Sequence, residues 1–65
     1  MDLREPIEIF CVHRSHKAIA IKAILEAHGV SCLLDGHGPV RVYIEAADVE
    51  RAIPVIGGDE MSKLL

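Results

Sequence analysis

The sequence predicts an α+β fold whose elements follow the order β-α-β-β-α. An apolar strand-like run, residues 7–12, precedes a longer stretch, 15–28, in which apolar side chains recur at helical spacing. Two further strand-like runs, 30–35 and 40–44, flank a short connection rich in glycine. A second amphipathic stretch, 48–56, closes the unit. This order is that of a split β-α-β unit, and it predicts a single domain.

The first strand follows a polar lead-in, residues 1–6, that ends at Pro6. Side chains alternate between the two faces of a strand, so residues 7–12 offer two candidate core faces. The more apolar face comprises Ile7, Ile9 and Cys11. We therefore expect the other three side chains to point away from the core, and these are Glu8, Phe10 and Val12.

Ser15 is the expected N-cap of the first helix, because its hydroxyl can accept a hydrogen bond from a free N–H of the first turn. Gly29 fits the position after the helix, where a left-handed backbone is needed. Ile19 falls among the polar side chains of the helix and is expected to be exposed. The apolar face of the helix comprises Ala18, Ile21, Ile24, Leu25 and His28.

The residues of the second and third predicted strands indicate how the two strands pair. Pairing Asp35 with Arg41 opposes unlike charges, and it also pairs Leu33 with Tyr43 and Leu34 with Val42, residues that agree in face. A right-handed crossover followed by this hairpin gives a three-stranded sheet in the order 1-3-2, with both helices on one face. The inward residues are Val30, Cys32 and Leu34 on one strand and Val40, Val42 and Ile44 on the other.

The second helix should present Val49, Ala52, Ile53 and Ile56 to the core. Pro54 lacks an N–H, so the helix is expected to kink or stop near Ile53. The predicted core unit therefore spans residues 7–56 of the 65. Residues 59–65 are expected to form a short helical turn or a tail that docks on the core or on a partner, through Met61, Leu64 and Leu65.

Composition narrows the function classes. A net charge of −3 and only two aromatic residues, Phe10 and Tyr43, argue against a nucleic-acid binder. No apolar stretch approaches the roughly 20 residues that cross a bilayer, and the amino terminus lacks a signal-peptide core, so a cytoplasmic protein with reduced thiols is expected. Because 51% of the residues of so short a chain are apolar, part of its apolar surface is expected to be buried against a second copy or another protein.

Two stretches carry a family resemblance. They are AIAIKAILEAHGV, at residues 18–30, and VYIEAADVERAI, at residues 42–53. Through them the chain resembles a prokaryotic signal-transducing domain family of unknown function, whose fold is similar to that of the nitrogen-regulatory PII proteins. The resemblance extends over about residues 7–56, with departures at Ile19 and Pro54. It implies a ferredoxin-like half and a regulatory role, and it transfers no binding residue.

Two candidate ligand sites lie between the first strand and the first helix. Cys11, His13 and His16 have the side chains that bind zinc or copper, although a tetrahedral site needs a fourth ligand. Arg14, Ser15 and Lys17 could instead hold a small anion at the start of the helix. The simpler alternatives are a buried thiol with two loop histidines, and a solvated basic turn. No catalytic residue and no cofactor are expected.

The third candidate is an interface on the face of the sheet that no helix covers. Under the predicted alternation this face carries an apolar patch, which is typical of a surface where proteins associate. The patch comprises Phe10, Val12, Leu33 and Tyr43. The exposed edge of the first strand offers a second route to association, and the tail could alternatively fold back over the patch. The sequence thus predicts a small binding or regulatory domain that forms a homodimer or binds a protein partner.

Overall fold

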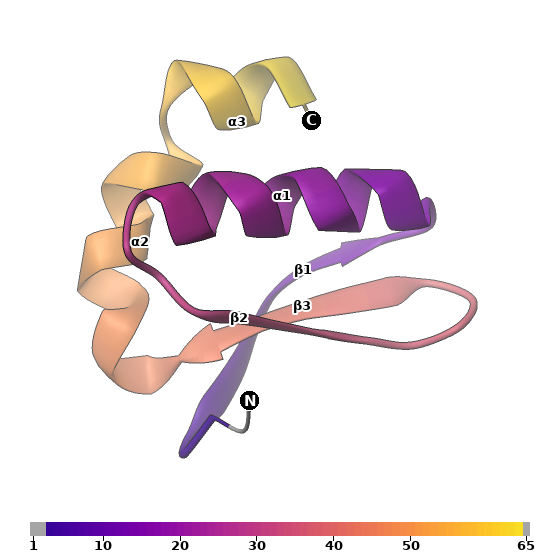
Figure 1. Cartoon of the computed structure of the whole chain (residues 1–65), viewed down its shortest axis with the longest axis horizontal. Coiled ribbons are helices and arrows are strands. Elements are labelled where there is room, and N and C mark those ends of the chain that lie inside the picture. Colours follow the sequence, from indigo (N-terminus) through magenta and orange to yellow (C-terminus); the bar gives the residue numbers. More distant parts are fainter. Residues whose placement is uncertain (1–2, 65) are drawn as a thin grey trace.

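A computed structural model describes residues 3–64 and confirms the predicted α+β fold. Three antiparallel strands form one sheet in the order β1-β3-β2. Figure 1 shows α1 across one side of this sheet, α2 at its end, and α3 on the far side of α1 from the strands. The elements are β1 (Pro6–Val12), α1 (Ser15–Ala27), β2 (Cys32–Asp35), β3 (Val40–Glu45), the 3₁₀ turn η1 (Ala46–Asp48), α2 (Val49–Ile56) and α3 (Asp59–Leu64).

The hairpin of β2 and β3 has the predicted register. Asp35 pairs with Arg41, Leu33 with Tyr43 and Leu34 with Val42. The inward side chains of β3 are buried beneath α1, and Cys32 and Leu34 pack against the same core. The core comprises Ala18, Ile21, Leu25, Val30, Val40, Val42, Ile44, Ala52 and Met61.

Helix α1 ends as predicted but begins differently. Gly29 has a φ of +81°, its N–H donates to the Glu26 carbonyl, and the N–H of Val30 donates to the Leu25 carbonyl. These two bonds form a Schellman motif. At the other end the prediction of Ser15 as N-cap is wrong. The extended residue Arg14 is the N-cap, without a side-chain capping bond, because Ser15 already has helical geometry.

Strand β1 contains a bulge that overturns the predicted faces beyond Ile9, which itself packs against the core as predicted. The register with β3 shifts between Glu8, which pairs with Tyr43, and Phe10, which pairs with Val42. One extra residue in a strand reverses the alternation beyond it. Phe10 and Val12 therefore pack against the core, whereas Cys11, which was predicted to be inward, is exposed on the other face.

The second helix is also rotated relative to its predicted phase. Ala52 is buried, but Ile53, predicted as a core residue, is 60% exposed. Val49 and Ile56 pack against the core as predicted, and Val55 takes the place of Ile53, so the packed stripe of the helix is turned towards Val55. Helix α2 continues through Pro54 and ends at Ile56, two residues beyond the proline, so the expected stop near Ile53 is wrong.

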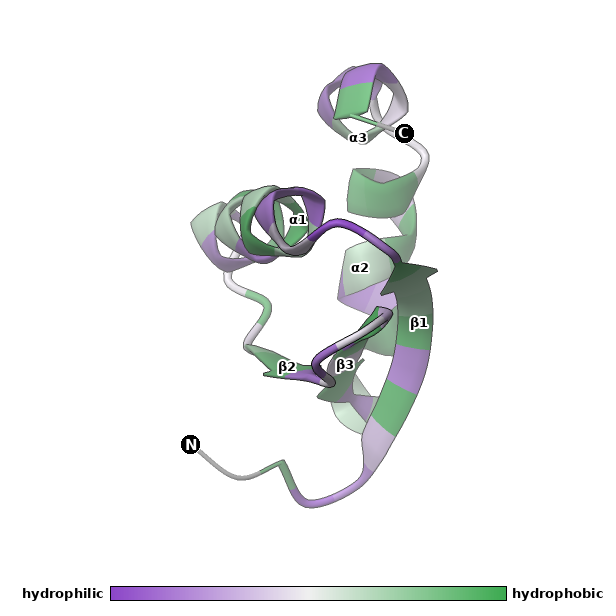
Figure 2. Ribbon diagram, turned by 90° about the vertical axis from the view of Figure 1, so that its right-hand side faces the viewer, coloured by the Kyte–Doolittle hydropathy of each residue, from purple (hydrophilic) through white to green (hydrophobic). Residues whose placement is uncertain are grey.

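The carboxyl-terminal segment forms α3 and docks on the helices. Met61 is fully buried and α3 contacts both α1 and α2. Figure 2, turned by 90° from Figure 1, shows α1 and α3 on the same side of strands β2 and β3. The alternative in which this segment covers the opposite face of the sheet is therefore wrong for the described residues. Leu65, which was predicted to take part, lies outside them.

No helix within residues 3–64 is both long enough and apolar enough to cross a membrane.

Candidate functional site: the open face and free edge of the sheet

The face of the sheet opposite the helices, called here the outer face, is lined by side chains from all three strands. The inward alternation of β3 turns its intervening residues outward, and their partners in the register share that face. The outer face comprises Pro6, Glu8 and Cys11 of β1, Leu33 and Asp35 of β2, and Arg41, Tyr43 and Glu45 of β3. Of the four predicted interface residues it contains Leu33 and Tyr43, but not Phe10 or Val12, so the face is more polar than predicted.

Leu33 and Tyr43 form the apolar centre of the outer face. They are directly opposed on β2 and β3, and both are half-buried. Tyr43 is also opposed to Glu8 on its other side. A tyrosine packed on a leucine in the middle of a sheet presents an apolar ring and a hydroxyl together, which is the combination common at protein interfaces.

Arg41 supplies the positive charge of the outer face, two residues before Tyr43 on the central strand. Its Nε lies 3.7 Å from Oε1 of Glu8, and Asp35 is its direct neighbour on β2. The side chain of Tyr43, followed by the Glu8 carboxylate, holds the pKa of Arg41 above its usual value. Because both ionic side chains are exposed, the pair orients the guanidinium more than it stabilises the fold.

The predicted metal site is not assembled. Cys11 lies on the outer face, whereas His16 lies in the first turn of α1, on the opposite side of the sheet, and His13 is in the bend between them. No three His, Cys, Asp or Glu side chains among the described residues are close enough to share a metal ion. The bulge is the physical reason, because it turns Cys11 away from the helix.

The predicted anion site remains a prediction. Arg14, Ser15 and Lys17 do lie together at the start of α1, whose first turn has no acidic residue. Arg14 and Ser15 are exposed and Lys17 is half-buried. This arrangement suits a solvated basic turn as well as an anion.

The two cysteines differ strongly in their surroundings. Both are free thiols, and β3 separates their strands. Cys11 is exposed, while the Cys32 thiol lies 3.7 Å from the Val30 carbonyl oxygen, to which it donates. Burial, followed by the nearby Glu26 carboxylate, raises the pKa of Cys32 from 9.0 to about 11. The folded chain therefore keeps this thiol protonated at a pH where the unfolded chain does not.

We expect the two thiols to react in separate phases with a thiol reagent at pH 8. With a pKa of about 11, only about one Cys32 side chain in a thousand is a thiolate at that pH, so Cys11 should react first. Replacing Cys11 with alanine should remove the fast phase alone. A fast phase that persists in Cys11→Ala would contradict the assignment.

The raised pKa of Cys32 also predicts a pH dependence of stability. The free energy of unfolding should fall as the pH rises from about 9 towards 11, because in this range the unfolded chain loses the thiol proton and the folded chain keeps it.

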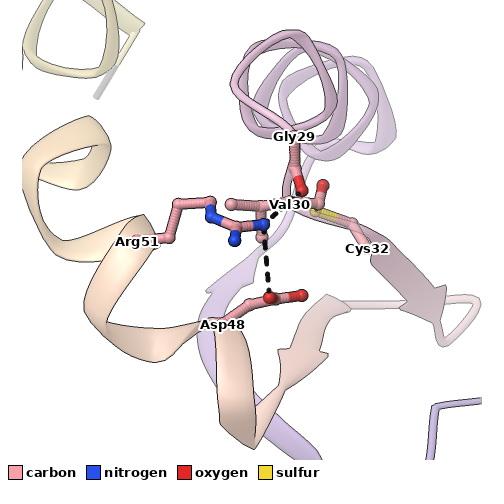
Figure 3. A network of polar contacts seen from close by, with 5 residues as sticks. All are labelled: Gly29, Val30, Cys32, Asp48 and Arg51. Atoms are coloured by element: carbon pink, nitrogen blue, oxygen red, sulfur yellow. Dashed lines mark hydrogen bonds and ion pairs between the residues drawn. The ribbon is translucent and has the colours of Figure 1, made fainter.

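Arg51 ties α2 to the end of α1, a role that sequence analysis missed. Its Nη1 donates to the carbonyl oxygen of Gly29 at 3.2 Å and lies 3.6 Å from Oδ1 of Asp48 (Figure 3). The carbonyl belongs to the loop that leads to Val30 and Cys32. This network positions the loop before β2, and its three groups satisfy one another, so we assign it a structural role. The three-residue spacing of Asp48 and Arg51, which suits an ion pair across one helical turn, was the feature of the sequence that could have predicted part of this network.

Glu45 holds the amino-terminal lead-in against the sheet. Its carboxylate accepts the N–H groups of Arg4 at 2.7 Å and Glu5 at 3.1 Å, and the N–H of Ala46 donates to the Glu5 carbonyl. An open hollow of about 760 Å³ lies beside it, between residues 3–5, Ser31 and residues 45–48. Since the carboxylate already binds two backbone groups, we interpret this contact as structural.

Comparison with protein-family models, with curated proteins and with solved structures gave no match. The resemblance to the signal-transducing family therefore stays a prediction from the sequence.

Proposed function

We propose that this chain is a small cytoplasmic binding domain with a regulatory, signal-transducing role, and that it recognises a protein partner through its outer face. The observation that carries the proposal is the Leu33–Tyr43 pair, which lies in the middle of a sheet face that none of the described helices covers. Tyrosine and arginine are the residues that most often dominate binding energy at protein interfaces. The family resemblance supports the regulatory part.

The charges around this pair suggest the chemistry of the partner. Two carboxylates, those of Glu8 and Asp35, flank the single guanidinium of Arg41. The outer face is therefore acidic around an apolar centre. A partner segment that fits it carries an apolar or aromatic side chain bordered by lysine or arginine. The proposal assigns no reaction and no cofactor to the chain.

A reducing compartment agrees with the thiols. Cys11 and Cys32 are both free, and Cys11 is exposed on the surface that we propose for binding. An exposed, unpaired thiol persists in a reducing cytoplasm and is readily oxidised outside it.

Tyr43 provides a direct test, because it is the only tyrosine of a chain that has no tryptophan. We would immobilise the wild-type chain, Tyr43→Ala and Ile19→Ala, and identify the proteins that each retains from a cell lysate. Ile19 is the matched control, since it is also a large exposed apolar residue but lies on α1, away from the outer face. Loss of a central aromatic side chain should weaken binding at least about tenfold, and Ile19→Ala should retain the wild-type affinity.

The purified partner then gives the decisive measurement. Bound at the outer face, it should protect the fluorescence of Tyr43 from quenching by acrylamide. Unchanged quenching when the chain is saturated with a partner, or equal binding by Tyr43→Ala, would place recognition elsewhere and defeat the proposal.

A further inference from the structure

Strand β1 has a free edge. It pairs with β3 on one side, and no segment within residues 3–64 pairs with its other side. In a complete split β-α-β unit a second crossover would add a strand next to the first. Here the chain leaves α2 and forms α3 on the helix side, so no strand within the described residues pairs with the backbone groups along the outer edge of β1.

The ladder between β1 and β3 determines which groups these are. The Ala46 N–H donates to the Glu5 carbonyl, so Ile7 and Ile44, two residues further on, also direct their backbone groups towards each other. By the same alternation the groups of Glu8 point to the free edge. Beyond the bulge, Phe10 and Val12 bond to β3, and the groups of Cys11 point to the free edge.

The bulge makes this edge unusual. In a regular strand the outward backbone groups recur every second residue, whereas in β1 Glu8 and Cys11 are three residues apart. A regular strand therefore cannot bond to both residues without a bulge of its own. A second copy of β1 has the same three-residue spacing, and it matches when it runs antiparallel.

We propose that β1 pairs with β1 of a second copy of this chain, antiparallel, about a twofold axis that passes between Ile9 and Phe10. Glu8 of each copy then lies opposite Cys11 of the other, and each such pair can exchange both of its backbone hydrogen bonds. The bulge that disfavours other strands thus selects the chain's own strand.

The side chains agree with this register. Ile7 lies opposite Val12 of the second copy, and both residues are on the helix side of the sheet. Ile7 is 41% exposed in the single chain and is one of the three exposed large apolar side chains among the described residues. The pairing covers this side chain. On the outer face Glu8 lies opposite a cysteine of the second copy rather than another carboxylate, so no two carboxylates are directly opposed.

Such a dimer joins the two three-stranded sheets into one continuous sheet. The two outer faces become a single surface, which extends the proposed function by presenting the Leu33–Tyr43 pair twice to a partner. The dimer inference itself rests on the edge of β1 and not on the outer face. Because a paired edge of a few residues buries little area, we expect a concentration-dependent dimer.

The test is a cross-link between the two opposed positions. In Glu8→Cys the new thiol should lie opposite Cys11 of the second copy, with Cα atoms about 5.5 Å apart, which suits a disulfide. Within one chain the two positions are roughly 10 Å apart, too far to bridge. Under mild oxidation we expect a covalent dimer, identified on a non-reducing gel, with the linked peptides located by mass spectrometry.

Two variants serve as controls. Glu50→Cys places an exposed thiol on α2 with the same loss of charge, and it should cross-link at least about tenfold more slowly, because no pairing concentrates its thiol. Adding Cys11→Ala to Glu8→Cys should abolish the cross-link. In parallel, the mass of the wild-type chain from light scattering should double as concentration rises.

Equal cross-linking by Glu8→Cys and Glu50→Cys, or a wild-type chain that stays monomeric at every concentration, would overturn the inference. Neither result would contradict the proposed function, since Tyr43 lies on β3, one strand away from the edge. Conversely, the edge dimer should form without any change in the quenching of Tyr43, so the two ideas fail separately.

Discussion

Replacing Met61 with alanine should destabilise the chain by about 2–5 kcal/mol, the range for large-to-alanine changes in a core. Met61 is fully buried and belongs to the one core cluster that also contains Ile21 and Leu25 of α1. For 65 residues the whole stability is about 3–10 kcal/mol, so the loss should lower the urea midpoint steeply or leave the chain unfolded.

Two neighbouring changes separate packing from other effects. Met61→Leu keeps the apolar volume and should cost less than about 1.5 kcal/mol, so it remains folded if packing is the cause. Ser62→Ala alters an exposed residue of the same helix and should stay within about 0.5 kcal/mol of wild type. A Met61→Ala variant as stable as Ser62→Ala would mean that α3 contributes no packing energy.

Gly36→Ala should cost at least about 2 kcal/mol, because two penalties combine at this turn. Gly36 has a φ of +113°, which residues with a side chain rarely adopt, and an added Cβ would collide with the carbonyl oxygen of Pro39. The obstacle is backbone, so it cannot move away without disturbing the first residue of β3. Urea unfolding measures the loss, and hydrogen exchange at Val40 and Arg41 should show the weakened start of the strand.

Two other glycines calibrate this result. At Gly38 an added Cβ meets nothing within 4 Å, so Gly38→Ala should be neutral or stabilise by up to about 1 kcal/mol. At Gly29 the φ is +81°, and the nearest atom is the mobile end of Arg51 at 3.9 Å, so alanine should cost about 1–2 kcal/mol. The expected order of cost is Gly36, then Gly29, then Gly38. Similar losses at Gly36 and Gly38 would refute the steric explanation.

The sequence was sufficient for the hairpin and insufficient for the first strand, and the difference has a physical cause. In β3 polar and apolar residues alternate, and pairing Asp35 of β2 with Arg41 opposes unlike charges, so one register satisfies every pair. In β1 both alternation phases contain apolar residues, for example Ile7 in one and Phe10 in the other. Only the pairing with β3, which introduces the bulge, determines which of these residues face the core. Nothing in the local sequence of β1 predicts that bulge.

The wrong assignment of faces in β1 also made part of the predicted interface wrong. Moving Phe10 and Val12 inward removes half of the predicted patch, while the same shift brings Cys11 to the outer face beside Arg41. The contacts of Glu45 with the lead-in and of Arg51 with Gly29 also escaped prediction. Each joins a side chain to backbone far away in the sequence, and such contacts follow from the assembled fold rather than from local spacing.

The place of β3 in the sheet also sets the order in which the chain can fold. The central strand comes last in the sequence of strands, so β1 finds its partner only across the whole of α1 and β2. Helix α1 and the β2–β3 hairpin need only local contacts, whereas closing the long loop between β1 and β3 costs chain entropy before it gains any pairing. The docking of β1 is therefore the expected slow step of folding. Until it occurs, Ile7, Phe10 and Val12 face water on a strand with two open edges, and this is the moment when the chain is most exposed to aggregation.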